Sequence, residues 1–159
     1  MVRVRLVVEQ DLKEIFNIER QSFPNPYSFD FFKLLVETCS NWFIVATNEF
    51  EKNDEKPSIL GYAVANILQW DRGQIGHIIS IAIRPENRRK GIGTKLMKEL
   101  IHRLQNDKCI QVRLEVSTTN RAALEMYKKF GFMEVDFIPN YYIEGGDASV
   151  QVLDLGVSY

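Results

Sequence analysis

The stretch Ile78–Leu100, IISIAIRPENRRKGIGTKLMKEL, decides the fold. Four isoleucines within its first six residues are typical of a strand that is buried on both faces. Pro85 ends this strand because proline has no N–H to give to the ladder. A basic loop with two glycines follows, and an amphipathic helix pattern begins after it. The stretch therefore predicts a strand, a tight loop and a helix in unbroken succession.

The loop Arg88–Gly93 reads RRKGIG. Its glycines allow a tight turn with consecutive exposed N–H groups, and the helix start and three basic side chains add positive charge. These features predict an anion site, most naturally for phosphate. The loop is not a P-loop, which needs G-x-x-x-x-G-K-[ST], and it lacks the third glycine of the dinucleotide fingerprint.

Length and charge set limits on the function. The chain has 159 residues, which suits one domain, and its 20 Lys and Arg against 21 Asp and Glu argue mildly against nucleic acid as a partner. No apolar run has the length of a transmembrane helix, and the charged N-terminus does not resemble a signal peptide, so we expect a cytoplasmic protein. Cys39 and Cys109 lack metal-ligand spacing and are expected to be buried thiols.

The remaining pattern predicts a mixed α/β fold, with antiparallel hairpins first and strand–helix–strand crossovers later. Ser28 is a predicted cap for the second helix, and Asn120 or Thr119 opens the fourth, which Gly131 ends. The charged segment 47–58 is expected to be a mobile hairpin loop. Strands are predicted at residues 2–8, 42–46, 59–68, 75–83, 110–116, 132–138 and 148–155, and helices from Asp11, over 28–38, after the glycine loop and before Gly131.

A second motif, NRAALEMYKKFGF, covers Asn120–Phe132. Together with the R-x-x-G-x-G loop, it resembles the two ordered signatures of the GCN5-related N-acetyltransferase (GNAT) superfamily. The segments GHIISIAI at 76–83 and YY at 141–142, followed by GDA at 146–148, are similar to the protein N-terminal acetyltransferases of the RimI-type, archaeal and eukaryotic groups. The resemblance covers nearly the whole chain. It implies one GNAT domain over 1–159, with a mixed sheet of six to seven strands, splayed at the acetyl-CoA strand, and about four helices.

This resemblance implies direct transfer of an acetyl group from acetyl-CoA to an amine, with no acyl-enzyme and no metal. Neither cysteine has a histidine at a recognisable spacing, which agrees with a direct route. Pyrophosphate is expected on the loop amides and pantetheine along the end of the strand before them. The expected cosubstrate-binding residues are Ile81, Ala82, Ile83, Arg88, Arg89, Lys90, Gly91, Ile92, Gly93, Thr94, Asn120 and Tyr127.

Three residues are candidates for proton transfer. An α-amino group has a pKa of about 7.7–8 and needs only a modest base, whereas a lysine side chain has a pKa of about 10.4 and needs a stronger one. Glu115 is the first candidate for the base, and His77 is the second, with water as a third route. Tyr127 matches the tyrosine that protonates the thiolate in the family. Each also has a structural alternative: a solvated or Arg113-paired carboxylate, a core histidine and a core aromatic.

Two aromatic segments are expected to hold the acceptor. Phe23, Pro24 and Tyr27 in one loop and Tyr141 and Tyr142 in another are candidates for clamping the first residues of a peptide. The implied partner is a protein or peptide N-terminus, with no nucleic acid and no membrane. An auxiliary subunit or ribosome association and a monomer or homodimer all fit the family. The alternatives are a lysine or small-amine acetyltransferase and a non-catalytic acyl-CoA or nucleotide-binding module.

Overall fold

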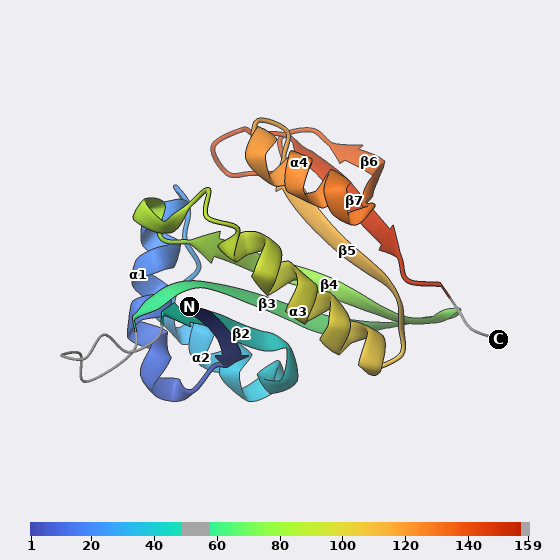
Figure 1. Ribbon diagram of the computed structural model, residues 1–159. Coiled ribbons are helices and arrows are strands. Elements are labelled where there is room, and N and C mark those ends of the chain that lie inside the picture. The colour runs from blue at the N-terminus through green and yellow to red at the C-terminus, as the bar shows by residue number, and fades with distance from the viewer. Residues whose placement is uncertain (49–57, 157–159) are drawn as a thin grey trace. The chain divides into compact units, whose positions relative to one another are not determined.

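The computed structural model describes residues 1–48 and 58–156 (Figure 1). These residues form one seven-stranded sheet with the order β1-β2-β3-β4-β5-β7-β6, together with four α-helices. The strands are β1 (Val2–Leu6), β2 (Phe43–Asn48), β3 (Ile59–Trp70), β4 (Gly73–Ile83), β5 (Cys109–Ser117), β6 (Met133–Ile138) and β7 (Ala148–Asp154). The helices are α1 (Leu12–Ser22), α2 (Phe29–Thr38), α3 (Ile92–Asn106) and α4 (Arg121–Phe130).

The predicted fold class is confirmed. The first strands pair antiparallel, β1 with β2 and β2 with β3, whereas β4 and β5 pair parallel. The predicted first strand is two residues too long, because the Val8 N–H turns to bond Asp11 Oδ2 at 2.9 Å and a 3-10 turn follows. Trp42 also lies in a 3-10 turn, so β2 starts one residue later than predicted. Most of the predicted loop 47–58 lies outside the described residues, and its first two residues belong to β2.

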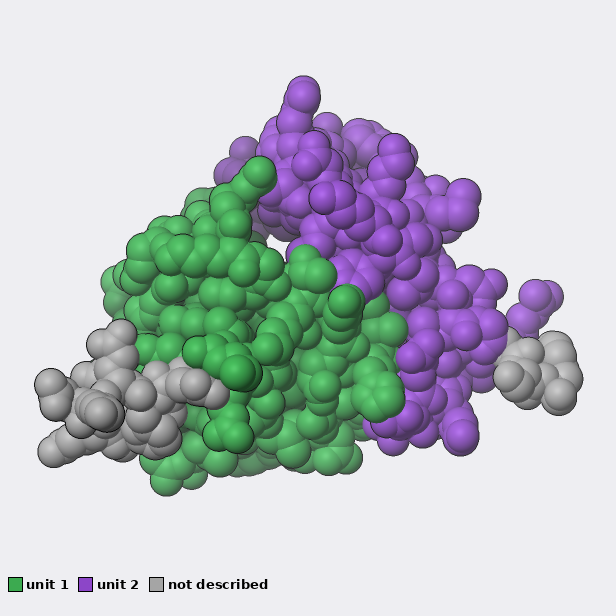
Figure 2. Space-filling view, viewed as in Figure 1, with its two compact units in different colours: residues 1–66, 79–103 green, residues 67–78, 104–159 purple. Residues whose placement is uncertain are grey.

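The chain divides into two compact units, which Figure 2 shows in different colours. Unit 1 contains Met1–Asn66 and Ile79–Arg103, and unit 2 contains Ile67–Ile78 and Leu104–Tyr159. Strands β3 and β4 each contribute residues to both units. None of the helices within the described residues is long and apolar enough to cross a membrane.

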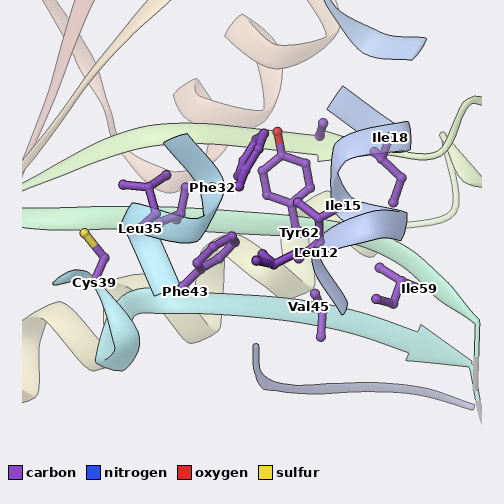
Figure 3. Close-up of a cluster of buried hydrophobic side chains, with 12 residues drawn as sticks. Leu12, Ile15, Ile18, Phe32, Leu35, Cys39, Phe43, Val45, Ile59 and Tyr62 are labelled. Carbon is purple, nitrogen blue, oxygen red and sulfur yellow. The ribbon is translucent and has the colours of Figure 1, made fainter. Parts of the chain in front are cut away.

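Unit 1 is built on an aromatic core (Figure 3). The ring of Phe32 lies 5.6 Å from that of Tyr62 and 6.3 Å from that of Phe43, centre to centre. Ser28 caps helix α2, which carries Phe32, as predicted: its Oγ accepts the Phe31 N–H at 3.1 Å. The buried cluster comprises Leu12, Ile15, Ile18, Phe32, Leu35, Cys39, Phe43, Val45, Ile59, Tyr62, Val64 and Ala82.

Close strand packing in unit 1 requires a glycine. A Cβ at Gly61 of β3 would lie 2.6 Å from Ile83 Cδ1 and 2.8 Å from the Ala82 carbonyl oxygen on β4. The backbone oxygen cannot move aside as a flexible side chain does. Gly61 therefore permits the approach of β3 to the end of β4, directly before the glycine loop.

Unit 2 is organised around β5. Val112, Leu114 and Val116 are buried, and Arg113 and Glu115 alternate with them, as the sequence pattern predicts. Strand β5 pairs antiparallel with β7, and Glu115 lies opposite Val150. Its parallel ladder with β4 ends with His77 opposite Arg113. The side chains of His77, Arg113 and Glu115 therefore project from the same face of this ladder.

Candidate active site

The glycine loop in unit 1 has the backbone of an anion site. After a 3-10 turn at Pro85–Asn87, Arg89 and Gly91 adopt positive φ angles of 64° and 77°. Helix α3 then begins at Ile92, and its first amides have no carbonyl partner within the helix, as at any helix start. These N–H groups and the helix dipole favour a bound phosphate. Cosubstrate binding by these loop residues stays a prediction.

Two basic side chains of this loop bond to the protein itself. Arg88 donates from Nε to the Ile83 carbonyl oxygen at 3.1 Å and from its terminal nitrogen to Ser22 Oγ at 3.2 Å. Lys90 Nζ donates to the Glu86 carbonyl oxygen at 3.0 Å. These bonds fix the path of the loop between β4 and α3. Direct contact of the two side chains with an anion stays a prediction.

Unit 2 joins two of the predicted catalytic residues. His77 Nε2 lies 2.7 Å from Glu115 Oε2, and both side chains are half-buried. Arg113 donates from Nε to the other carboxylate oxygen of Glu115, at 3.3 Å. The Arg113-paired alternative for Glu115 is thus present in the structure, but the histidine contact is present with it.

The surroundings keep Glu115 ionised at neutral pH. The hydrogen bond with His77 is the largest influence and lowers the pKa of Glu115 below its ordinary value of 4.5, although burial opposes this shift. Arg113 lowers the pKa further through its hydrogen bond and charge. An ionised Glu115 only accepts hydrogen bonds, so His77 is the donor of this bond, from Nε2.

Tyr127 lies on α4 with its side chain buried, 5.6 Å from the ring of Phe132. Burial raises its pKa well above the ordinary range, and the nearby Tyr142 raises it further, so the phenol keeps its proton. Of the two predicted openers, Asn120 and Thr119, the structure has Asn120 as the cap of helix α4: its Oδ1 accepts the Ala123 N–H at 3.2 Å. Gly131 ends the helix in the left-handed conformation, with φ 97°.

The two predicted substrate tyrosines of unit 2 lie in the loop between β6 and β7. Their rings are 5.0 Å apart and nearly perpendicular. Asp147 holds the loop at both ends: its Oδ1 accepts the Asn140 N–H at 2.9 Å, and its carbonyl oxygen accepts the Thr118 N–H at 3.1 Å. Burial raises the pKa of Tyr141, and the charge of Glu115 raises it further. Tyr141 therefore lies within electrostatic reach of the His77–Glu115 pair.

The other predicted substrate residues, Phe23, Pro24 and Tyr27, lie in unit 1 between α1 and α2. All three are exposed, with 36% of Phe23 and 42% of Tyr27 accessible, which leaves aromatic surface available to a ligand. The Tyr27 ring packs against Phe31 with centroids 4.6 Å apart. The loop is thus anchored on one side and open on the other.

One buried polar cluster in unit 1 was not predicted. The Glu19 carboxylate accepts hydrogen bonds from Tyr62 Oη and Ser80 Oγ and from the Tyr27 N–H. Burial raises the pKa of Glu19, and these hydrogen bonds oppose the shift. The available sequence signal was a glutamate on the apolar stripe of the first helix, next to Ile15 and Ile18.

The remaining candidates for chemistry are the two cysteines and the residue types that bind metals. Burial raises the pKa of Cys109 to about 11, so it is an uncharged thiol at neutral pH, and Cys39 is buried as well. Within residues 1–48 and 58–156, no three His, Cys, Asp or Glu side chains gather where they could hold a metal ion.

A family model described as "Acetyltransferase (GNAT) family" matches residues 12–132. The chain belongs to this family. The acetyltransferase is 31% identical to an N-alpha-acetyltransferase of Sulfolobus acidocaldarius over 163 aligned residues, which cover 96% of this chain and 92% of the relative. It is 28% identical to a putative ribosomal protein bS18-alanine N-acetyltransferase of Bacillus subtilis, with 91% and 89% covered.

The fold comparison agrees. A chain in the crystal structure of the NatC complex bound to Gag peptide and CoA superimposes with a TM-score of 0.88, at 23% identity, with 98% of this acetyltransferase and 99% of that chain covered. The predicted GNAT fold is therefore confirmed. The protein is an acetyl-CoA-dependent N-acetyltransferase, and acetyl-CoA is its cosubstrate.

Replacing His77 should raise the pKa of Glu115. We expect His77→Ala to move this pKa upward toward 4.5, and Arg113→Ala to move it less, because the His77 hydrogen bond is the larger influence. Since the folded pKa is the lower one, the pair stabilises the fold above about pH 4.5, and this stabilisation is lost as the pH falls through the folded pKa. Carboxyl ¹³C NMR measures the titration.

His102→Ala on α3 is the matched control, because His102 is not among the groups that shift the pKa of Glu115. A Glu115 that titrates at or above its ordinary value in the unmodified acetyltransferase would contradict the paired state.

Proposed function

We propose that the protein transfers the acetyl group of acetyl-CoA to the α-amino group of a protein N-terminus. The observation that carries the proposal is the His77–Glu115 hydrogen bond at 2.7 Å, within electrostatic reach of Tyr141. The pair provides a proton acceptor, and the exposed aromatic loops provide surface for the first residues of a peptide. The names of the relatives, an N-alpha-acetyltransferase and a ribosomal protein alanine N-acetyltransferase, support this substrate class.

The His77–Glu115 pair acts as the base. An α-ammonium group with a pKa of about 7.7–8 must lose one proton before its nitrogen can attack. Glu115 is a weak base on its own because its pKa is lowered, and we assign proton uptake to Nδ1 of His77, whose Nε2 donates to the carboxylate. The charge also stabilises the imidazolium that forms, as a carboxylate does in other carboxylate–histidine pairs. The proton taken from the amine is therefore held on His77, beside the ionised Glu115.

Transfer then proceeds in one bond exchange. The amine nitrogen attacks the thioester carbon, the C–N bond forms, and the C–S bond breaks to release the CoA thiolate. The second proton that the nitrogen loses passes to this thiolate, so the products are the amide and the CoA thiol. Tyr127 keeps its proton because of its raised pKa and donates a hydrogen bond to the sulfur as its charge develops. The uncharged thiol of Cys109 is a poor nucleophile, which supports direct transfer without an acyl-enzyme.

The wider assignments belong to the same proposal. Residues 1–159 act as one catalytic domain in the cytoplasm. Partners other than the substrate N-terminus, such as an auxiliary subunit, the ribosome or a second copy of the chain, stay predictions from the family resemblance.

A peptide panel tests the substrate class. Short peptides with free N-termini that differ in their first two residues should be acetylated on the α-amino group, as mass spectrometry with fragmentation will show. The matched controls are the same peptides with a blocked N-terminus and an internal lysine. Acetylated lysine in the controls, with unmodified free N-termini, would refute the proposal in favour of a lysine acetyltransferase.

The base variants should show a loss that depends on pH. We expect Glu115→Gln and His77→Ala to lower kcat/KM about 10²-fold near pH 7, within the range for general-base catalysis. The loss should shrink above pH 8, because the amine is then already deprotonated. Rates measured from pH 6 to 9.5 give the profile, and His102→Ala should retain the parent profile. Parallel profiles for parent and variants would mean that water removes the proton without the pair.

The Tyr127 variant separates chemistry from binding. Tyr127→Phe removes one hydroxyl and keeps the ring, so we expect kcat to fall about 10- to 100-fold, as for a lost hydrogen bond to a developing charge. The Kd for acetyl-CoA, measured by calorimetry, should stay within about twofold. An unchanged kcat would show that Tyr127 is only a packing residue of α4.

A further inference from the structure

Unit 1 contains a buried carboxylate that the catalytic scheme does not use. Glu19 lies near the end of α1 and is 1% exposed. Three donors converge on its two carboxylate oxygens. Tyr62 Oη and Ser80 Oγ donate to Oε2, the latter at 3.4 Å, and the Tyr27 N–H donates to Oε1 at 3.0 Å. A carboxylate removed from water is tolerated only with such partners, so its surroundings are built for an acceptor at this position.

Glu19 holds both ends of the loop 23–28. Its main-chain carbonyl oxygen accepts the Phe23 N–H at 3.0 Å, where α1 ends. Its side chain accepts the Tyr27 N–H, immediately before the Ser28 cap of α2. Pro24 and Pro26 lie between these two bonds and restrict the φ angles of the connecting backbone. The backbone of Glu19 thus bonds the loop where it leaves α1, and its side chain bonds the loop just before α2.

A chain of aromatic contacts also connects Tyr27 to Glu19 through the core. The Tyr27 ring lies 6.4 Å from the ring of Phe32, edge to face. Phe32 packs edge to face against Tyr62 at 5.6 Å, and Figure 3 shows the two rings together in the core. The Tyr62 hydroxyl returns to Glu19. The backbone and the ring of Tyr27 are therefore fixed by parts of one buried cluster, while 42% of this residue faces solvent.

We propose that Glu19 is a positioning residue for the acceptor substrate: its buried carboxylate holds the loop 23–28 in the conformation that presents Phe23 and Tyr27 to the first residues of the peptide. Glu19 does not touch the substrate. This inference rests on the proposed function, in which the exposed aromatics of this loop contact the peptide. It predicts an effect on peptide binding that is separate from acetyl-CoA binding.

Two conservative variants separate reach from charge. Glu19→Gln keeps the length of the side chain and an oxygen for the Tyr27 N–H, and its NH₂ group can donate to a hydroxyl oxygen of Tyr62 or Ser80. Glu19→Asp keeps the charge but withdraws the carboxylate by one methylene, so it cannot reach both the Tyr27 N–H and the Tyr62 hydroxyl. A residue that only fills the core, or only supplies charge, would not give opposite results for these two changes.

The experiment measures peptide KM, kcat and acetyl-CoA Kd for the parent, Glu19→Gln, Glu19→Asp and Glu19→Ala. We expect Glu19→Asp and Glu19→Ala to raise peptide KM about tenfold, as for one lost hydrogen bond to a charged acceptor. Both variants should leave acetyl-CoA Kd within about twofold of the parent value. Glu19→Gln should keep peptide KM within about threefold of the parent value. Hydrogen exchange at the Tyr27 amide gives a readout without substrate. The protection of this amide should fall in Glu19→Asp and Glu19→Ala and persist in Glu19→Gln.

Asp11→Asn is the matched control. Asp11 is also a buried carboxylate in unit 1, and it pairs with Arg5 at 2.6 Å near the start of α1. This variant should lower thermal stability but leave peptide KM and the protection of the Tyr27 amide unchanged. It separates the general cost of losing a buried carboxylate from the loss of the loop contact.

The outcomes distinguish this inference from the proposed function. If the parent acetylates no free peptide N-terminus, the proposed substrate is wrong and the substrate role of Glu19 falls with it. If the parent acetylates free peptide N-termini, but Glu19→Asp and Glu19→Ala keep the parent peptide KM and the protection of the Tyr27 amide, only the role of Glu19 is overturned. If Glu19→Ala does not fold, the comparison of Glu19→Asp with Glu19→Gln still tests the role of Glu19. Equal peptide KM values for these two variants would refute the inference.

Discussion

The parallel ladder between β4 and β5 is the constraint on which the proposed chemistry depends. It places His77 opposite Arg113, and the two-residue period of a strand then puts Glu115 on the same face, within 2.7 Å of His77. A shift of the register by one residue would turn His77 away from both partners. The apolar residues that alternate along β5 oppose such a shift, because it would expose Val112 and Leu114, which are buried.

The same sheet creates opposite electrostatic conditions for two carboxylates. Glu115 is half-buried, and its neighbours His77 and Arg113 hold its pKa below the ordinary value. Glu19 is almost fully buried among uncharged donors, and burial holds its pKa above the ordinary value. The difference follows from what surrounds each group and not from the residue type. Glu115 is therefore ionised at neutral pH in unit 2, where we propose that a proton is taken up, and Glu19 in unit 1 has the positioning role that we propose.

Features determined by nearby residues could be predicted from the sequence. The glycine loop before α3, the caps at Ser28 and Asn120 and the αL glycine at Gly131 each depend on a few adjacent positions, and the structure confirms them. His77 and Glu115 were both identified as candidates, but their mutual hydrogen bond depends on the strand register, which alternation alone does not fix. The Glu19 cluster was missed because Tyr62 and Ser80 are 43 and 61 residues away along the chain.

The anchoring of the loop 23–28 at its two ends has an evolutionary consequence. Two of the hydrogen bonds that fix the loop are donated by the backbone N–H groups of Phe23 and Tyr27, so these two bonds do not require particular side chains at residues 24–26. Substitutions at those intermediate positions alter the exposed surface of the loop while these two backbone bonds remain. We therefore expect a chain with an acceptor at the position of Glu19 to keep both backbone bonds when residues 24–26 change.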